Sequence, residues 1–271
     1  MGELDGYGAL VTGGGSGIGL ACARRLAADG AAVTICGRTE KRLREAAGDM
    51  LRWVVADVTD EEQVKAAVTE AASATGSLDV AVACAGGSQH LGPIVASELE
   101  SWRATVDVNV LGTFLTLKHA APVMARRGRG SFVGISSIAG ISTHRYLSAY
   151  CVGKAGIDML VRVAADELGP SGIRVNSVRP GLVDTELVAG ILATGDVLND
   201  YLAQMPIARV GTPDDIAGLV RFLAGPDSTW VTGQTISVDG GHHLRRGPDY
   251  TPFAEPLYGA DTLRGLLPEG D

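Results

Sequence analysis

Seven short apolar runs, rich in strand-forming residues, alternate with amphipathic segments along most of the chain. The runs have the length of strands, and the segments between them repeat their apolar residues with helical spacing. Strands that alternate with helices form βαβ units, whose right-handed crossovers put the strands in parallel and helices on both faces. The sequence therefore predicts an α/β protein with a doubly wound parallel sheet of about seven strands. The predicted strands are Ala9–Thr12, Ala32–Cys36, Trp53–Ala56, Val80–Ala83, Ser131–Ile135, Arg174–Val178 and Thr235–Val238.

The chain length and the helical segments indicate one domain followed by a tail. A chain of 271 residues is long for one domain, but single α/β domains reach nearly this size. We predict a single domain over residues 1–246, with a substrate lid at about 186–206, and a proline-rich tail over 247–271. The prolines at positions 248, 252, 256 and 268 are expected to exclude a helix from this tail. The predicted helices are Ile18–Asp29, Glu61–Thr75, Glu98–Arg126, Tyr150–Leu168 and Pro213–Leu223.

Charge and cysteine content argue against several classes of function. A net charge of −8 and a pI of about 5.1 disfavour a nucleic-acid or anionic-membrane partner. The four cysteines lack C-x-x-C spacing and further ligands, so we expect free thiols and no metal site. Neither a basic leader nor a long apolar run is visible in the sequence. We therefore expect a cytoplasmic protein without a membrane segment.

A glycine-rich loop follows the first predicted strand directly and leads into the first predicted helix. It reads Thr12-Gly13-Gly14-Gly15-Ser16-Gly17-Ile18-Gly19. Glycines let the backbone approach a ligand closely, and the start of a helix offers free N–H groups to a pyrophosphate. The loop lacks the Gly-Lys-Ser/Thr ending of a triphosphate site. Its place between the first strand and first helix favours a dinucleotide in a Rossmann-like sheet.

An arginine stands where many dinucleotide-binding folds carry a carboxylate. That carboxylate, about 20 positions after the glycine loop, binds the ribose 2′-hydroxyl of NAD. Here Gly37 stands twenty residues after Gly17 and is followed by Arg38. A guanidinium binds a 2′-phosphate, and no carboxylate at this position repels one. The sequence therefore favours NADP(H), with NAD(H) as the alternative if Arg38 only ends the strand.

Three side chains form a complete set for proton transfer. Tyr150 and Lys154 are four residues apart at the start of a predicted helix, and Ser137 lies thirteen positions before Tyr150. Residues at i and i+4 share one helix face, so the two side chains can interact. We expect the ammonium to lower the pKa of the phenol toward neutrality. The serine hydroxyl can then donate to a developing alkoxide.

In these motifs the chain resembles the short-chain dehydrogenase/reductase family, of the type with a T-G-x-x-x-G-I-G glycine sequence. The resemblance covers roughly residues 6–241 and includes the glycine loop, Ser137 and Tyr150-x-x-x-Lys154. It implies that Asn109 is a fourth catalytic residue, which anchors a water molecule that relays protons past Lys154. It also implies cofactor contacts from Gly13, Gly15, Ser16, Gly17, Ile18, Gly19, Gly37, Arg38, Asp57, Val58, Ala85, Gly86, Tyr150, Lys154, Pro180, Gly181, Val183 and Thr185.

One segment departs from the family's pattern. Where the family commonly has Asn-Asn-Ala-Gly after the fourth strand, this chain reads Ala83-Cys84-Ala85-Gly86-Gly87. The small residues near the cofactor are kept, but the two amides are missing. Hydrogen bonds that those amides would supply must come from elsewhere. We expect a local effect on stability, with catalysis intact.

The resemblance implies an NADP(H)-dependent oxidoreductase that interconverts a ketone and a secondary alcohol by hydride transfer, with Tyr150 as acid and base. A β-ketoacyl thioester reductase is the alternative within the enzymes, and a non-catalytic NAD(P)-sensing regulator is the alternative outside them. The intact catalytic set argues against the regulator. The resemblance also implies a homotetramer. Aromatic residues between the tail prolines lead us to expect that residues 246–271 cross onto a neighbouring subunit and border its active site.

Two further segments bear on the substrate. The predicted lid is apolar and interrupted by glycines, which favours an aliphatic or alicyclic substrate over a highly charged one. His90 and His144 fall in loops after the fourth and fifth predicted strands, at the edge where such sheets bind ligands. We favour solvent-exposed positions for both histidines, with a place in the substrate pocket as the alternative.

Overall fold

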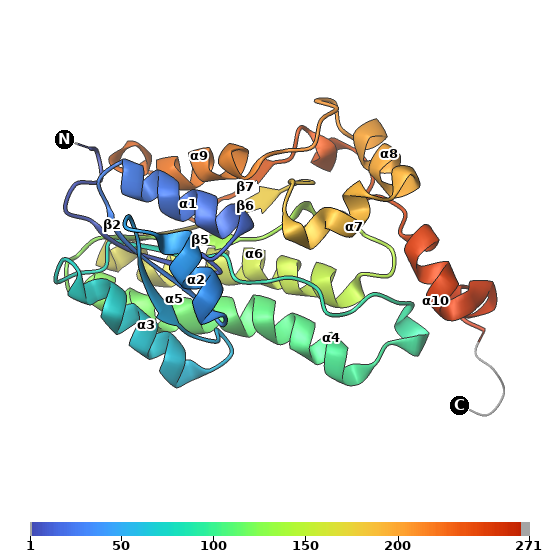
Figure 1. Ribbon diagram of the computed structural model, residues 1–271. Helices are drawn as coiled ribbons and strands as arrows, with labels where there is room; N and C mark the ends of the chain where they lie inside the picture. The colour runs from blue at the N-terminus through green and yellow to red at the C-terminus, as the bar shows by residue number, and fades with distance from the viewer. Residues whose placement is uncertain (1, 267–271) are drawn as a thin grey trace.

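The computed structural model describes residues 2–266, which contain one seven-stranded parallel sheet (Figure 1). The strand order is β3-β2-β1-β4-β5-β6-β7, so it reverses between β1 and β4. Connections from these two strands run to opposite sides, and a crevice forms at their carboxyl ends. All seven predicted strands are confirmed, β4 and β7 with the predicted ends and the other five with ends shifted by one or two residues: β1 (Gly8–Thr12), β2 (Ala32–Gly37), β3 (Arg52–Val55), β4 (Val80–Ala83), β5 (Gly130–Ile135), β6 (Ile173–Pro180) and β7 (Thr235–Val238).

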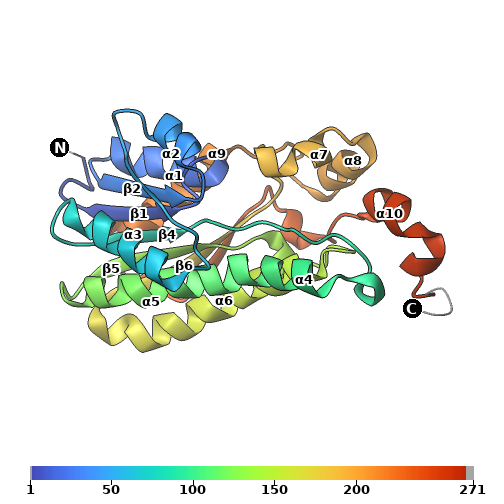
Figure 2. The same ribbon diagram turned by 60° about the horizontal axis from the view of Figure 1, so that its bottom comes forward.

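Helices cover both faces of the sheet (Figures 1 and 2). One layer contains α1 (Gly17–Ala28) and α9 (Pro213–Ala224), and the other contains α3 (Glu61–Ser73), α5 (Gly112–Ala125) and α6 (Ser148–Leu168). Successive side chains of β1 divide between the two layers, as the geometry of a strand requires. Ala9 and Val11 pack in the core under α1 and α9, whereas Leu10 packs under α3, α5 and α6.

The long predicted helix over residues 98–126 is interrupted in the structure. It consists of α4 (Leu99–Val106), a π-helical turn (Asp107–Leu111) and α5. Sequence periodicity also missed α2 (Glu40–Ala47), a short helix that follows β2.

The predicted homotetramer stays a prediction, but α5 and α6 do expose large apolar side chains, namely Phe114, Val152, Met159 and Val163. No helix within residues 2–266 has both the length and the apolar character needed to cross a bilayer.

The predicted lid lies beyond the carboxyl end of the sheet (Figure 1). It begins with a 3₁₀ turn (Glu186–Val188) and continues as α7 (Ala189–Leu192) and α8 (Gly195–Gln204). Val197, Tyr201 and Met205 are buried in a cluster with Ile138 and Leu147, which come from the segment between β5 and α6. The lid therefore packs against the part of the chain that carries Ser137 and Tyr150.

The expectation that prolines exclude a helix from the tail is wrong. The tail contains α10 (Thr251–Leu263), which bends at Gly259. Pro252 occupies the first turn, where a missing N–H removes no helical hydrogen bond, and Pro256 removes only one. The tail packs on its own chain beside the lid (Figure 2), and contact with a neighbouring subunit stays a prediction. Residues 267–271, including Pro268, lie outside the described part of the chain.

Candidate active site

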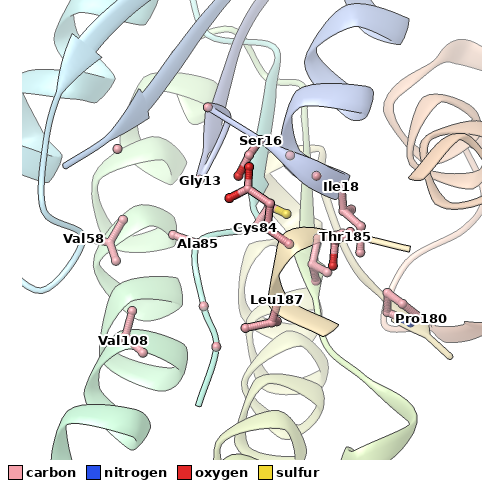
Figure 3. A pocket seen from close by; sticks show the side chains of 18 of the residues that line it. Gly13, Ser16, Ile18, Val58, Cys84, Ala85, Val108, Pro180, Thr185 and Leu187 are labelled. Atoms are coloured by element: carbon pink, nitrogen blue, oxygen red, sulfur yellow. The ribbon is translucent and has the colours of Figure 1, made fainter. Parts of the chain in front are cut away.

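A cleft of about 380 Å³ opens at the carboxyl ends of β1 and β4 (Figure 3). Every residue predicted to contact the cofactor lines this cleft, although these residues come from segments far apart in the sequence. The glycine loop lies directly beside Ala85, Gly86 also lines the cleft, and Pro180 to Thr185 come from the end of β6. The topology thus brings the whole predicted set together. Their individual roles stay predictions.

The glycine loop is shaped to receive a phosphate group. Gly13 has a φ of +65°, and a Cβ on it would lie 2.9 Å from the backbone nitrogen of Ala85, so only glycine fits here. Ser16 caps α1 in an extended conformation, and its side chain makes no capping hydrogen bond. The first turn of α1 also carries no acidic residue. Free amides and an uncompensated helix dipole at this point fit the pyrophosphate of a dinucleotide.

Two arginine residues line the cleft, and one of them, Arg42, lies against Gly15 of the glycine loop. Arg38 follows β2, as the sequence predicts, and Arg42 on α2 also lines the cleft. Arg42 was missed because its helix was not predicted, although the spacing of four residues from Arg38 was visible in the sequence. Its Nη1 lies 3.0 Å from Oε2 of Glu186, the first residue of the lid. This part of the cleft can hold a phosphate.

Asp57 also lines the cleft, but its carboxylate is held by its own turn. Oδ1 accepts hydrogen bonds from the backbone nitrogen of Thr59 at 2.9 Å and from its hydroxyl at 2.8 Å. Although desolvation opposes it, these bonds and the charge of Arg38 together hold the pKa of Asp57 below its ordinary value. Because the Asp57 side chain is fixed, Asp57 and Val58 form a rigid part of the cleft wall.

The backbone after β4, where the family's two amides are missing, is supported by a side chain of β1. The Thr12 hydroxyl accepts hydrogen bonds from the backbone nitrogens of Cys84 and Ala85, both at 3.1 Å. Thr12 belongs to β1, so this single side chain ties the two strands together where the cleft opens. Burial raises the pKa of the Cys84 thiol to about 11, which keeps it neutral. The departure from the family's pattern therefore leaves the loop with a hydrogen-bonded support.

α6 carries Tyr150 and Lys154 on the face toward the cleft. Lys154 Nζ lies 5.4 Å from the centre of the Tyr150 ring and donates a hydrogen bond to the backbone oxygen of Ile135 at 2.8 Å. The Ser136 hydroxyl donates to the backbone oxygen of Lys154 at 3.0 Å, which fixes α6 to the end of β5. Lys154 is buried, with an exposed fraction of 4%, and these bonds hold its ammonium at one position.

Asn109 lies in the π-helical turn between α4 and α5. Its Nδ2 donates hydrogen bonds to the backbone oxygens of Gly87 and Thr105, both at 2.7 Å. A Cβ on Gly86 would lie 2.6 Å from Oδ1 of Asn109 and 3.2 Å from Nζ of Lys154. The amide oxygen and the ammonium therefore approach the same point behind Gly86. Asn109 does not line the cleft itself, and its role in holding a water molecule stays a prediction.

The phenol of Tyr150 does not have the lowered pKa that the sequence predicts. Desolvation raises the pKa of Tyr150 to about 12, and a hydrogen bond with the Ser137 hydroxyl offsets only part of this rise. Lys154 faces the ring of Tyr150 and is itself desolvated, which lowers the pKa of its ammonium to about 8. Tyr150 is therefore protonated at neutral pH, as a proton donor must be.

Ser137 is positioned to donate its hydroxyl hydrogen into the cleft. The residue follows β5, and its Oγ accepts a hydrogen bond from the backbone nitrogen of Ala139 at 3.1 Å. An oxygen that already accepts one bond is better aligned to donate its own hydrogen elsewhere. Ser137, Tyr150 and Lys154 line the cleft together with the glycine loop. The arrangement can polarise an oxygen and transfer a proton to it.

The interpretation of His90 and His144 as solvent-exposed is wrong. The exposed fractions of the two side chains are 4% and 5%. His90 Nε2 lies 3.0 Å from the Ser97 hydroxyl, and the His144 ring packs between Tyr201 of the lid and Tyr250 of the tail. His90 is buried against Ser97 and Ser101 near the start of α4, and His144 is buried against α8 and the tail, whose positions the local sequence does not reveal.

Known proteins were found that resemble the chain over most of its length. The family model described as "Enoyl-(Acyl carrier protein) reductase" matches residues 13–243. The cis-4-hydroxycyclohexanecarboxylate dehydrogenase of Sinomonas cyclohexanicum is 42% identical over 240 residues, which are 86% of this chain and 95% of that protein. The structure of a short-chain type dehydrogenase/reductase from Mycobacterium ulcerans is 47% identical, with a TM-score of 0.95, and covers 97% of this chain and 99% of its own.

A further solved structure contains a cofactor. The gluconate 5-dehydrogenase from Burkholderia cenocepacia J2315, in complex with NADP and tartrate, is 33% identical to this chain. Its TM-score is 0.85, and the match covers 89% of this chain and 97% of that protein.

Proposed function

The chain belongs to the short-chain dehydrogenase/reductase family, and from this premise we propose that it is an NADP(H)-dependent enzyme that interconverts a ketone and a secondary alcohol on an apolar, alicyclic substrate. As a member of this family it is an oxidoreductase acting on CH–OH and C=O groups. The observation that carries the finer proposal is that Ser137, Tyr150 and Lys154 line the same cleft as the glycine loop and Arg38.

The proposed mechanism assigns one task to each side chain. A bound dinucleotide would be held by the glycine loop and Arg38, and it would supply a hydride to the carbonyl carbon in reduction and accept one in oxidation. Ser137 donates a hydrogen bond to the substrate oxygen, and Tyr150 donates the proton that converts the oxygen to a hydroxyl. The Lys154 ammonium stabilises negative charge on the phenol after the proton has left. In oxidation the same groups act in the reverse order.

An alicyclic substrate is supported by the lid and by a relative. The buried cluster under the lid contains Leu147, Leu182, Val197 and Met205, which offer no charge to a substrate. The similar protein from Sinomonas cyclohexanicum is named for a hydroxylated cyclohexane ring. A NAD(P)H absorbance assay against cyclic ketones, cyclic alcohols and a β-ketoacyl thioester tests the proposal. Turnover of the thioester alone would favour the β-ketoacyl alternative, and turnover of none would contradict the proposed function.

Replacement of Arg38 by alanine is expected to weaken the use of NADP(H) selectively. Hydrogen bonds to charged groups contribute about 1.5–3 kcal/mol, so kcat/KM for NADPH should fall about 10–150-fold. NADH carries no 2′-phosphate, so its kcat/KM should change by less than about threefold. The measurement is steady-state kinetics with both dinucleotides and one ketone.

Arg44→Ala is the matched control for this variant. Arg44 lies on α2. Its replacement removes one positive charge, as Arg38→Ala does, but Arg44 is exposed and does not line the cleft. Its kinetics should equal those of the unaltered protein. Equal losses with NADPH and NADH in Arg38→Ala, or a preference of the unaltered protein for NADH, would contradict the proposed cofactor.

The pH dependence of ketone reduction should report Lys154. Desolvation lowers the pKa of Lys154 to about 8, so the ammonium loses its charge as the pH rises through this value. Tyr150, with a pKa of about 12, stays protonated over the same range. We expect kcat/KM for reduction to be constant below about pH 7.5 and to fall about tenfold per pH unit well above 8. The fall should disappear in Lys154→Met; a fall retained in that variant would contradict the assignment.

A further inference from the structure

Four aromatic side chains gather where the lid, the tail and the segment before α6 meet. Tyr201 comes from α8, Tyr250 stands at the start of α10, His144 precedes α6, and His242 follows β7. Their exposed fractions are between 0% and 6%. We call this group the tyrosine–histidine cluster. Tyr201 and Tyr250 belong to the same apolar cluster as Ile138, and the catalytic Tyr150 packs against that cluster.

The two phenols of the tyrosine–histidine cluster are paired with each other. The hydroxyl oxygens of Tyr201 and Tyr250 are 2.9 Å apart. Only one hydrogen can lie between two oxygens, so one phenol keeps a hydrogen that it can donate elsewhere. An unused hydroxyl hydrogen in a buried, apolar site needs a partner, because leaving it unpaired is unfavourable. The pair thus offers one donor and free oxygen lone pairs.

The two histidines offer acceptors. His144 Nδ1 lies 2.9 Å from the backbone oxygen of Ser142, and His242 Nε2 lies 2.9 Å from that of Arg246. A carbonyl oxygen only accepts, so these two nitrogens carry the hydrogens. Burial lowers the pKa of both rings, that of His144 to about 4, so both are neutral. The opposite nitrogens are therefore acceptors, and His242 Nδ1 has no hydrogen-bond partner among residues 2–266.

Charged side chains near the cluster are paired with one another at the surface. Arg246 donates to both carboxylate oxygens of Asp200, at 2.6 and 3.1 Å, and Arg145 lies 3.2 Å from Asp249. Both arginine side chains are about 60% exposed. The first pair holds the start of the tail on α8, and the second holds it on the segment before α6. Neither pair brings a cation to the buried side of the tyrosine–histidine cluster.

We propose that the Tyr201–Tyr250 pair and the neighbouring histidines bind a second, uncharged oxygen of a cyclic substrate whose reacting carbon lies at Tyr150. This inference rests on the proposed function and names its substrate class. A hydroxyl group both donates and accepts, and so matches a site with one free phenol hydrogen and two imidazole acceptors. A carboxylate only accepts and would lose its hydration without meeting a cation. The site therefore selects a diol or a hydroxy ketone over a keto acid.

Tyr250 gives the tail a specific part in this selection. The family model matches only as far as residue 243, so Tyr250 lies beyond the matched region. The tail is also anchored independently, because the Tyr258 hydroxyl donates to the backbone oxygen of Leu91 at 2.7 Å. Removal of one phenol oxygen from the cluster should therefore change substrate selection while α10 stays attached.

Three ketones test the inference: cyclohexanone, 4-hydroxycyclohexanone and 4-oxocyclohexanecarboxylate. A site that hydrogen-bonds a substrate hydroxyl rejects the analogue that lacks it, so we expect kcat/KM to favour 4-hydroxycyclohexanone over cyclohexanone by about 10–100-fold. The keto acid should be the poorest substrate of the three. Equal values for the first two ketones, or the highest value for the keto acid, would overturn the inference and leave the proposed function in place.

Tyr250→Phe and Tyr201→Phe should each reduce this preference to within about threefold of unity, because each removes an oxygen from the pair. The preference is the ratio of the two kcat/KM values in one variant, so a change common to both ketones does not affect it. Tyr258→Phe is the matched control, since it removes a hydroxyl from the same helix outside the cluster, and it should keep the preference. An equal loss in Tyr258→Phe would assign the effect to docking of α10 and overturn the inference. No turnover of any of the three ketones, with either dinucleotide, would contradict the proposed function as well.

Discussion

Tyr150→Phe is expected to lower kcat for ketone reduction by about 10²–10⁴-fold, the contribution typical of a positioned proton donor. The phenol is protonated at neutral pH, because desolvation raises its pKa to about 12, and it lies beside the Ser137 hydroxyl in the cleft. Phenylalanine keeps the ring that packs under the lid but has no proton to give. Steady-state kinetics and the Kd for NADPH, measured by fluorescence titration, separate catalysis from binding.

The Kd for NADPH should change by less than about threefold in Tyr150→Phe, since the glycine loop and Arg38 are untouched. Tyr7→Phe is a matched control. Tyr7 precedes β1, at the amino ends of the strands, and lines no part of the cleft. This control should retain full activity. Turnover by Tyr150→Phe within tenfold of the unaltered protein would show that another group supplies the proton.

Lys154→Met should lower kcat/KM for ketone reduction by about 10²–10⁴-fold. The estimate follows from two lost interactions of about 1.5–3 kcal/mol each, one with the dinucleotide and one with the charge that develops on Tyr150. Methionine fills a similar volume, so the core around α6 should keep its packing. The same substitution leaves the backbone oxygen of Ile135 without the hydrogen bond that Nζ now donates to it.

Thermal unfolding of Lys154→Met distinguishes a catalytic loss from a folding defect. One unpaired backbone oxygen costs about 1–3 kcal/mol, which lowers Tm by several degrees without unfolding the protein at 25 °C. Lys118→Met is the matched control, because Lys118 lies on α5 at the surface and pairs with Glu61. Full activity in Lys154→Met, at any stability, would remove this lysine from the mechanism.

Local patterns were sufficient for the elements that build the cleft. Apolar runs located all seven strands, and the signal has a clear cause in the central strands β1 and β4, which are buried along their whole length and are therefore apolar. The glycines between β1 and α1 were recognisable because the backbone there meets neighbouring segments too closely for a side chain; a Cβ on Gly13 would collide with Ala85. The spacing of Tyr150 and Lys154 reflects a single helix face. These features depend on short stretches of chain.

Such short patterns do not predict where a helix is interrupted or how the tail packs. The π-helical turn that aims Asn109 at Gly87 has no local sequence signal distinct from that of an α-helix. The prolines of the tail do not exclude a helix, because Pro252 stands in a first turn, where it removes no helical hydrogen bond. Whether α10 forms depends on Tyr250 and Tyr258 finding partners on α8 and near Leu91.

By itself the sequence determined the parallel sheet, the glycine-rich loop between β1 and α1 and the identity of the groups that meet at the cleft, because strand pattern, glycine geometry and helix spacing act over a few residues. Only the tertiary structure decided the protonation of those groups. The raised pKa of Tyr150, the lowered pKa of Lys154 and the neutral His144 all arise mainly from desolvation. Desolvation sums the atoms that surround a group from every direction, and most of these atoms belong to segments distant in the chain.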